Sequence, residues 1–345
     1  MCNIAGYIGD RPAAPVLVDM MRNQEGFCGG YYTGIVTLHE GRLNCAKVMG
    51  DVDRLLDRTD ALQLPGTCGL IHSRSKSGGD WRWAHPFTAD EGALALVLNG
   101  GKVQYEPVCD DTGAARFLWK QGVRFDTECP WAEEIRSFPV LENGNSVHDT
   151  ELICLLTDWY RKQENLPTDQ ALEKAFQRVP MEAVALVMHA KDGETISFAN
   201  YNMPMTVART EKETFLASFS ICLPADRDYI SKEVLPHACS GMVTAQQTCI
   251  HRFRPVKPIG ALTPQIVHAG WESILRLLEE SGPCTIGQLN NAVRVLWKDT
   301  IDQRYPLTYS ILQTLFDMGR LRVVKTVQPG VESPLTAPLF RLELN

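Results

Sequence analysis

A cysteine stands directly after the first methionine, in the opening sequence MCNIAGY. Removal of Met1 would leave Cys2 with both a thiol and a free α-amine. Because an α-amine titrates near pH ~8 and a lysine only near ~10.4, this amine could take the thiol's proton directly or through one water. Nucleophile and base would then lie on one residue. The alternative is that a cysteine at position 2 simply begins a buried strand, so the choice depends on the remaining sequence.

Four separated segments resemble, in matching order and spacing, the signatures of class II glutamine amidotransferases, the family with an N-terminal nucleophile. They are the opening segment, GLIHSR at 69–74, VLNG at 97–100 and HDTEL at 148–152. The resemblance covers about the first 255 residues and is greatest to the glutaminase half of glucosamine-6-phosphate synthase. It implies an α+β fold, in which a four-layer αββα sandwich of the N-terminal-nucleophile hydrolase type forms the main domain.

The resemblance also implies a reaction. Cys2 would attack the side-chain amide of L-glutamine, release ammonia and form a thioester that water hydrolyses to glutamate. The side-chain amide of Asn99 and the backbone N–H of Gly100 would bind the tetrahedral oxyanion, and losing one such donor typically slows catalysis by about 10²-fold to 10³-fold. Taken alone, an Asn-Gly pair after a strand would instead indicate a tight turn.

The charged end of glutamine requires a partner for each of its two groups, and the resemblance supplies candidates. Arg74 offers a planar guanidinium fork for the α-carboxylate, and Asp149 offers a negative charge for the α-ammonium. Ser77 falls in the substrate loop and is expected to hydrogen-bond glutamine. The alternatives are that Arg74 is a strand-end or surface arginine and that Asp149 is a helix N-cap before Thr150. Asp149 could serve as cap and ligand together.

Several positions depart from the family's pattern. Gly78 replaces a histidine, Ser75 replaces a tryptophan that gates ammonia passage, and Asn3 and Leu98 replace a glycine and a histidine. The segment 25–34 retains only the final glycine of its counterpart. These changes affect closing of the pocket and delivery of ammonia more than cleavage of the amide.

The histidines and cysteines give no sign of a metal site. The eight histidines are scattered along the chain, and for His85, which resembles a family His-Pro, we expect a structural role. Eleven cysteines, an odd number without paired Cys-x-x-Cys spacing, indicate reduced thiols rather than disulfides or zinc ligands. We therefore expect neither a metal nor another cofactor.

Composition is that of a globular protein, with 44% hydrophobic and 22% charged residues among 345. The net charge of −7 argues against binding nucleic acid through a general positive field. No basic leader precedes an apolar stretch, and no apolar run approaches the ~18 residues that span a bilayer. We expect a cytoplasmic protein without membrane contact.

The periodicity up to about residue 255 indicates strands with a few amphipathic helices. Helices interposed between two groups of strands favour a sandwich with helical outer layers over βαβ units. The stretch 101–144 has a poor pattern and is interpreted as an insertion of unknown role. The expected helices are 13–24, 150–162 and 168–179, and the expected strands are 4–8, 33–38, 43–48, 69–73, 93–98, 183–189, 195–199, 205–208, 214–217, 242–246 and 250–253.

A proline-dense linker at 256–264 marks the expected boundary between the domain 1–255 and a second domain, 265–345. Helices at 271–280, 285–293 and 307–318 followed by strands at 321–327 and 338–344 predict a winged helix-turn-helix. The third helix contains no lysine or arginine, so DNA binding is disfavoured, and Arg320, Arg322 and Lys325 would be the residues to test. A partner-docking or dimerising module, including a homodimer, is the preferred interpretation.

The leading hypothesis is a glutaminase that releases ammonia for a separate acceptor enzyme. One alternative is a glutamine-sensing regulator whose winged helix binds DNA or a protein. Another keeps the fold and nucleophile but changes the substrate to a different amide, because the loop at 75–79 is altered.

Overall fold

The first of two large sheets is built around β1 (Asn3–Ile8), in which every residue is buried. The computed structural model describes residues 2–345. Within its sheet β1 pairs with β12 (Thr214–Ala217) and β4 (Cys68–Arg74), antiparallel to each. Because β1 is buried on both faces, other layers must also cover the sheet from both sides. The full order is β13-β11-β12-β1-β4-β2-β3. The remaining strands are β2 (Tyr32–His39), β3 (Arg42–Met49), β11 (Thr206–Arg209) and β13 (Ser231–Val234).

The second sheet has the order β15-β14-β10-β9-β6-β5. Its centre is the antiparallel pair of β6 (Leu94–Gly101) and β9 (Glu182–His189), with Asn99 opposite Val184 and Gly100 opposite Ala183. The other strands are β5 (Phe87–Ala89), β10 (Ile196–Asn200), β14 (Cys239–Val243) and β15 (Thr248–Arg252). A further small pair, β7 (Cys129–Pro130) and β8 (Asn145–Ser146), lies in the following long connection.

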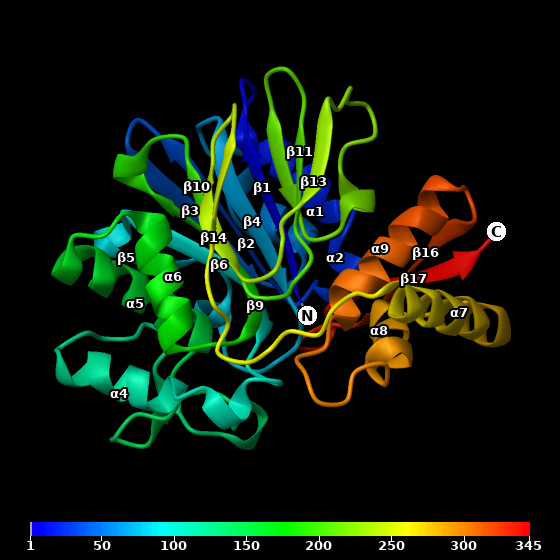
Figure 1. The fold of residues 1–345 in the computed structure, drawn as a ribbon. Helices are drawn as coiled ribbons and strands as arrows, with labels where there is room; N and C mark the ends of the chain where they lie inside the picture. The colour runs from blue at the N-terminus through cyan, green and yellow to red at the C-terminus, as the bar shows by residue number, and fades with distance from the viewer. Residues whose placement is uncertain (1) are drawn as a thin grey trace.

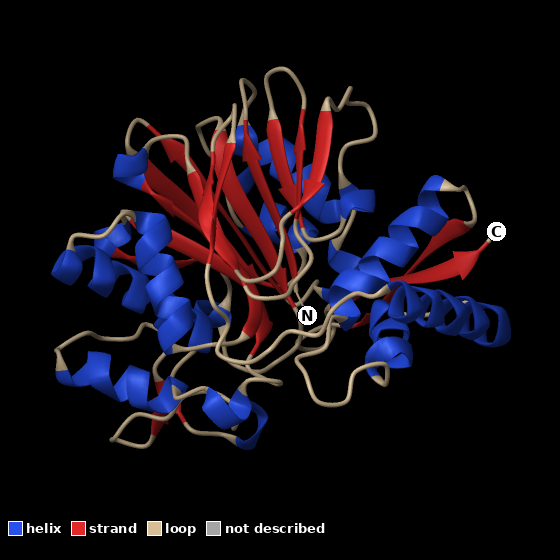
Figure 2. Cartoon of the chain, in the orientation of Figure 1, coloured by secondary structure: helices blue, strands red, loops and turns tan. Residues whose placement is uncertain are grey.

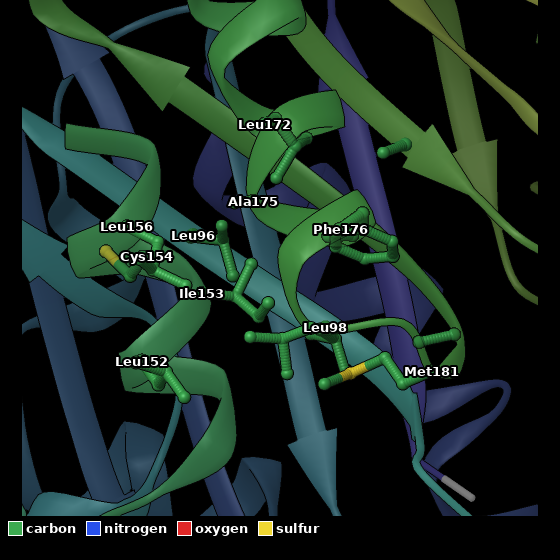
Figure 3. Packing of buried hydrophobic residues seen from close by; sticks show 14 of the residues in the cluster. Leu96, Leu98, Leu152, Ile153, Cys154, Leu156, Leu172, Ala175, Phe176 and Met181 are labelled. Atoms are coloured by element: carbon green, nitrogen blue, oxygen red, sulfur yellow. The ribbon is translucent and has the colours of Figure 1, made fainter. Parts of the chain in front are cut away.

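The two sheets pack face to face, and helices cover their outer faces (Figures 1 and 2). Ile4, Leu70, Val97 and Leu186 belong to the apolar cluster between the sheets. Helices α1 (Ala13–Arg22) and α3 (Val52–Arg58) cover the first sheet, whereas α5 (Asp149–Glu164) and α6 (Thr168–Arg178) cover the second. Figure 3 shows Leu152, Ile153 and Leu156 of α5 beside Leu96 and Leu98 of β6, with Phe176 of α6 nearby.

Most expected strands and helices overlap the observed ones. The strand expected at 242–246 is instead β14 at Cys239–Val243, the helix expected at 271–280 begins at Pro264, and the short elements were missed. Helix α2 (Glu25–Cys28) has only one turn, and β5 and β13 are short edge strands. Helix α4 (Asp111–Lys120) lies in the stretch that was interpreted as an insertion. Its buried face consists of Asp111, Ala114, Ala115 and Leu118, and such small or charged residues give almost no apolar periodicity.

After residue 255 the elements follow the expected order of three helices and two strands. They are α7 (Pro264–Ser281), α8 (Ile286–Arg294), α9 (Arg304–Asp317), β16 (Leu321–Pro329) and β17 (Thr336–Leu344), the two strands forming an antiparallel hairpin. A capping box fixes the start of α8, because Thr285 and Gln288 satisfy each other's backbone N–H groups. The winged-helix description of these elements stays a prediction.

This C-terminal region shares a hydrophobic core with the main sheets. Phe27 of α2 packs edge-on against Phe340 of β17, with ring centroids 5.3 Å apart. Phe219, which follows β12, lies 5.4 Å from Phe27 and 4.5 Å from Tyr309 of α9. In Figure 1 the orange and red elements accordingly lie beside α2 and the N mark. The C-terminal region therefore packs against α2 and the residues that follow β12, next to the start of β1.

Among residues 2–345, no helix combines the length and the apolar character that crossing a bilayer requires.

Candidate active site

Cys2 lies immediately before β1, at the place where the two sheets meet. Its backbone nitrogen donates a hydrogen bond to Oδ1 of Asn99 at 2.8 Å, and this bond connects the first sheet to the second. Its Sγ lies 3.8 Å from Oγ of Ser75. Met1, whose removal would free the α-amine of Cys2, lies outside the described residues. After that removal, the nitrogen held by Asn99 would be the α-amine.

Asn99 and Gly100 lie inside β6, so the alternative of a tight turn is wrong for this pair. Gly100 has φ 136°, and a Cβ there would come within 2.0 Å of the carbonyl oxygen of Glu182, so only glycine fits. Asn99 is completely buried. Its Oδ1 accepts from Cys2, and its Nδ2 has no hydrogen-bond partner among residues 2–345. A buried donor without a partner is costly, which makes this N–H available to a ligand.

Arg74 ends β4 and is buried rather than on the surface, with 2% of the residue exposed. Its guanidinium lies 4.6 Å from the ring centroid of Tyr32 and 5.6 Å from that of Trp83. Burial lowers the pKa of Arg74, but a guanidinium remains charged at neutral pH. Within the described part of the chain no carboxylate forms an ion pair with it. Its charge is therefore unpaired before a ligand binds.

The loop that follows Arg74 is held by the same guanidinium. It donates to the carbonyl oxygens of Gly78 at 3.1 Å, Ser77 at 3.3 Å and Trp83 at 3.4 Å. Gly78 has φ 79°, a left-handed conformation that glycine adopts without strain. Ser77 is thereby fixed next to the guanidinium, although its own hydroxyl contacts only the carbonyl oxygen of Ser75 at 3.4 Å.

Asp149 is the first residue of α5, and the N-cap is His148 instead. The expected capping role of Asp149 was thus wrong by one residue, because Nδ1 of His148 accepts the Thr150 N–H at 3.0 Å. Burial acts to raise the pKa of Asp149, but the contact with His148 Nδ1, 3.0 Å from its Oδ1, and the nearby positive charge of Lys102 outweigh burial and lower the pKa. The carboxylate is therefore charged at neutral pH, with 15% of its side chain exposed.

One cavity joins these groups. Cys2, Arg74, Ser77, Gly100 and Asp149 all line a space of about 340 Å³, and Asn99 adjoins it through its hydrogen bond to Cys2. The volume lies at the lower end of the range of about 300 to 1,000 Å³ that is usual for small-molecule sites. The six residues selected from the sequence are thus brought together, while their roles stay predictions.

The sequence did not reveal the opposite wall of this cavity. Lys102, Val103 and Glu106 line it from the beginning of the 101–144 stretch, and Ser137 and Phe138 line it from near the end. The supposed insertion therefore forms part of the site. The only signal available was that this stretch directly follows Asn99 and Gly100.

Three of the histidines, which are far apart in the sequence, gather beside the cavity. The rings of His72 and His85 stack with centroids 3.7 Å apart, and His148 lies 5.5 Å from His85. Burial lowers the pKa of His72 to about 3 and that of His148 to about 4. Nδ1 of His85 accepts the Leu98 N–H at 3.2 Å. No group of three or more His, Cys, Asp or Glu residues between 2 and 345 is arranged to hold a metal ion.

Comparison with curated proteins gives relatives for the N-terminal part of the chain. It is 29% identical over 224 residues to the isomerizing glutamine–fructose-6-phosphate aminotransferase of Pyrococcus horikoshii, covering 63% of this chain and 32% of the relative. It is 31% identical over 222 residues to the enzyme of that name from Thermus thermophilus, with coverage of 63% and 32%. The chain thus spans about a third of the length of the curated relatives it matches. No family model matches the chain.

Solved structures share the fold. The glutamine phosphoribosylpyrophosphate amidotransferase of B. subtilis, complexed with ADP and GMP, superposes with a TM-score of 0.59 at 15% identity, over 82% of this chain and 60% of that one. The N-terminal region is thus similar in sequence to glutamine–fructose-6-phosphate aminotransferases and in fold to a glutamine phosphoribosylpyrophosphate amidotransferase. A structure described as the allosteric regulatory enzyme of purine biosynthesis gives a TM-score of 0.60, also at 15% identity, over 82% and 59% of the two chains. The chain is therefore related to enzymes, with a mixed α/β fold of antiparallel sheets similar to theirs.

Proposed function

We propose that this protein hydrolyses L-glutamine to glutamate and ammonia, with Cys2 as the nucleophile. The observation that carries the proposal is the hydrogen bond from the Cys2 nitrogen to Asn99 Oδ1, which leaves Nδ2 of the same side chain without a partner at the edge of the cavity. One amide thus orients the proposed base and offers a donor to an oxyanion. The sequence relatives support the same reaction type.

The proposed chemistry uses only groups of the chain and one water. The α-amine of Cys2 takes the thiol proton, and Sγ attacks the side-chain carbonyl carbon of glutamine. Asn99 Nδ2 and the Gly100 N–H stabilise the oxyanion, and the resulting α-ammonium protonates the leaving nitrogen as the C–N bond breaks. Water, deprotonated by the α-amine, then attacks the thioester and releases glutamate and the thiol.

The recognition of glutamine follows from the two charges at the cavity. Arg74 has an unpaired guanidinium that suits a carboxylate, and Asp149 remains ionised and suits an ammonium. Ser77 would donate a hydrogen bond to the bound amino acid from the loop that Arg74 holds. An amide without these charged ends would leave the buried guanidinium unpaired, so we propose that such amides are poor substrates.

We further propose that residues 1–255 form an αββα N-terminal-nucleophile domain, that 256–264 link it to the rest, and that 265–345 form a winged helix. The helices on the outer faces of the two sheets and the order of α7, α8, α9, β16 and β17 support this division. We also propose that the released ammonia passes to a separate acceptor enzyme. A cytoplasmic location and a homodimer remain expectations.

The alternative of a DNA-binding regulator receives little support from α9. Its residues Leu307, Tyr309, Ile311, Leu312 and Leu315 are buried, and its Gln313 accepts a hydrogen bond from Ser220 of the main domain. A recognition helix has to enter the major groove with an accessible polar face. We therefore prefer a role for this region within the enzyme or at a protein partner.

The test is an assay of the purified protein after removal of Met1 has been verified by intact mass. We expect release of glutamate and ammonia from glutamine, and covalent capture of a glutamine-like electrophile at Cys2. Cys2→Ser should lose both, whereas Cys45→Ser, at an exposed cysteine, should lose neither. Glutamine binding without turnover would support a sensor instead. Equal turnover of amides that lack an α-carboxylate would support a different amidohydrolase.

A further inference from the structure

Glu182 occupies an unusual place behind the proposed oxyanion site. It begins β9 opposite Gly101, and its carbonyl oxygen is the atom that excludes a Cβ at Gly100. Only 4% of its side chain is exposed. A carboxylate that is buried against the strand carrying Asn99 and Gly100 needs partners, since an unpaired buried charge is strongly unfavourable.

Those partners come from two different parts of the chain. Nε2 of Gln104, in the loop that follows Gly101, donates to Oε2 of Glu182. The guanidinium of Arg304, the first residue of α9, donates to Oε1 at 3.3 Å. The Arg304 side chain is only 6% exposed. One carboxylate therefore joins the segment 100–104 to the C-terminal region.

Gln104 is held a second time by the C-terminal region. Oε1 of Gln104 accepts the backbone N–H of Asp302 at 2.7 Å, and its carbonyl oxygen accepts from Nζ of Lys257 at 3.2 Å. Oδ1 of Asp302 lies 3.4 Å from Nε of Arg304. Both amide atoms of the Gln104 side chain are thus occupied, which fixes the end of the segment 100–104.

The segment before α9 is itself anchored in the main domain. Ile301 is buried in the apolar cluster between the second sheet and α5 and α6. Its backbone N–H donates to the carbonyl oxygen of Pro258 at 3.0 Å. The carbonyl oxygen of Asp302 accepts from Nδ2 of Asn202 at 3.1 Å. The backbone next to Arg304 is therefore held in place while its side chain contacts Glu182.

We propose that Arg304, Glu182 and Gln104 are positioning residues for glutamine hydrolysis, which makes the C-terminal region an integral part of the glutaminase site. None of the three touches the cavity, whereas Gly100, Gly101, Lys102 and Val103, which they hold, all line it. Their network fixes the backbone that presents the Gly100 N–H to the oxyanion. This inference rests on the proposed function.

The effect should appear in kcat rather than in KM. The oxyanion exists only after attack by Cys2. A displaced donor therefore stabilises the transition state less, whereas binding of glutamine by Arg74 and Asp149 is unchanged. A misplacement of about 1 Å can slow catalysis by about 10²-fold.

The experiment compares Arg304→Gln, Glu182→Gln and Gln104→Ala in the full chain. Gln104→Ala leaves the charged pair in place and removes the two side-chain hydrogen bonds of Gln104, one to Glu182 and one from the Asp302 N–H. We expect kcat for glutamine to fall by about tenfold to 100-fold in each, with KM within about twofold. Arg304→Lys, which keeps the charge, should recover part of the loss. Arg322→Gln is the matched control, because Arg322 pairs with Glu343 at 2.9 Å on the surface of the same region.

Two further measurements separate positioning from general damage. Alkylation of Cys2 by iodoacetamide, which forms no oxyanion, should proceed at the wild-type rate in every variant. Hydrogen exchange of the backbone amides at 100–104 should quicken in the three network variants and not in Arg322→Gln.

Several outcomes would contradict the positioning role of Arg304, Glu182 and Gln104. Unchanged kcat and unchanged exchange in the network variants would overturn it, as would a loss carried by KM or by slower alkylation of Cys2. Inactive wild-type protein would overturn the proposed function, and positioning of the 100–104 segment would then be judged by hydrogen exchange alone.

Discussion

The cavity and the core of the C-terminal region solve opposite problems. At the cavity, Arg74 and Asn99 are buried with a charge or a donor left without a partner among the described residues. In the C-terminal core, the buried side chains of Ile274 and Leu278 are apolar, while the ion pair of Arg322 lies at the surface with 61% of its side chain exposed. Polar burial of the first kind reduces stability and suits ligand binding, whereas apolar burial of the second kind supplies stability.

The difference predicts whether a substitution changes activity or the free energy of unfolding. Changes at the cavity should act mainly on activity. Changes in the C-terminal core should do the reverse, unless they reach the Arg304 network.

The largest effect is expected from Asn99→Asp. This change keeps an oxygen for the Cys2 nitrogen but replaces the Nδ2 donor with a negatively charged acceptor. We expect kcat for glutamine to fall by about 10²-fold to 10³-fold, measured as glutamate release. Asn291→Asp, at an exposed position of α8, is the control. A wild-type kcat in Asn99→Asp would remove Asn99 from the oxyanion site.

Arg74→Lys should have the next largest effect. Lysine keeps the positive charge but loses the planar fork that binds a carboxylate through two hydrogen bonds. We expect kcat/KM for glutamine to fall by about tenfold to 100-fold, equal to about 1.4 to 2.7 kcal/mol. Turnover of an amide without an α-carboxylate should be unchanged, and Arg82→Lys in the same loop should change neither. Parallel losses for both substrates would contradict carboxylate binding by Arg74.

Glu25 lies where the main domain and the C-terminal region meet, because it begins α2, which packs on β17. Burial raises the pKa of its carboxyl from 4.5 to about 8. The folded protein thus favours the protonated form, and the resulting stability is complete below the unfolded pKa and is lost as pH rises through about 8. Between pH 7 and 9 the wild type should lose about 1.4 kcal/mol relative to Glu25→Gln.

Urea unfolding of both proteins at pH 7 and pH 9 measures this difference. Glu332→Gln, at an exposed glutamate, should follow the wild type at both values. Identical pH dependence in the wild type and Glu25→Gln would show that Glu25 is not protonated in the folded protein at pH 7.

The smallest effect is expected from Ile274→Val in the C-terminal core. Removing one buried methylene group should lower the free energy of unfolding by about 1 kcal/mol. The activity of the folded protein at 25 °C should not change. Ile230→Val, where 69% of the isoleucine is exposed, should alter neither quantity. A loss of kcat in Ile274→Val would mean that the core and the cavity are more tightly coupled than the Arg304 network alone implies.

Local pattern was sufficient to predict most of the fold. The continuous apolar run of β1 and the periodicity of α5 indicated their structures because each depends on neighbouring residues. The one-turn helix α2 and the alanine-faced α4 carry too few large apolar residues for any period to emerge. The capping error at Asp149 was a shift of one residue, which is within the usual uncertainty of helix ends.

The site divides in the same way. Cys2, Arg74, Asn99 and Asp149 lie in short motifs whose order could be recognised, although their roles still await experiment. Phe138 lines the cavity only because the chain folds back toward Cys2 and Arg74, and no residue near Phe138 in the sequence indicates this fold. The stacking of His72 on His85 likewise depends on two separate segments.

The packing of Phe340 on Phe27 has a practical consequence for anyone who wishes to shorten this protein. A fragment ending before α7 would present Phe27, Phe219 and Cys222 to water, because all three belong to the core that the last helices complete. Such a fragment would tend to self-associate, and its aggregation would say nothing about whether Cys2 can cleave an amide. The region before α7 is therefore unsuitable for use in fusion proteins unless these three positions are first redesigned as a solvent-facing surface.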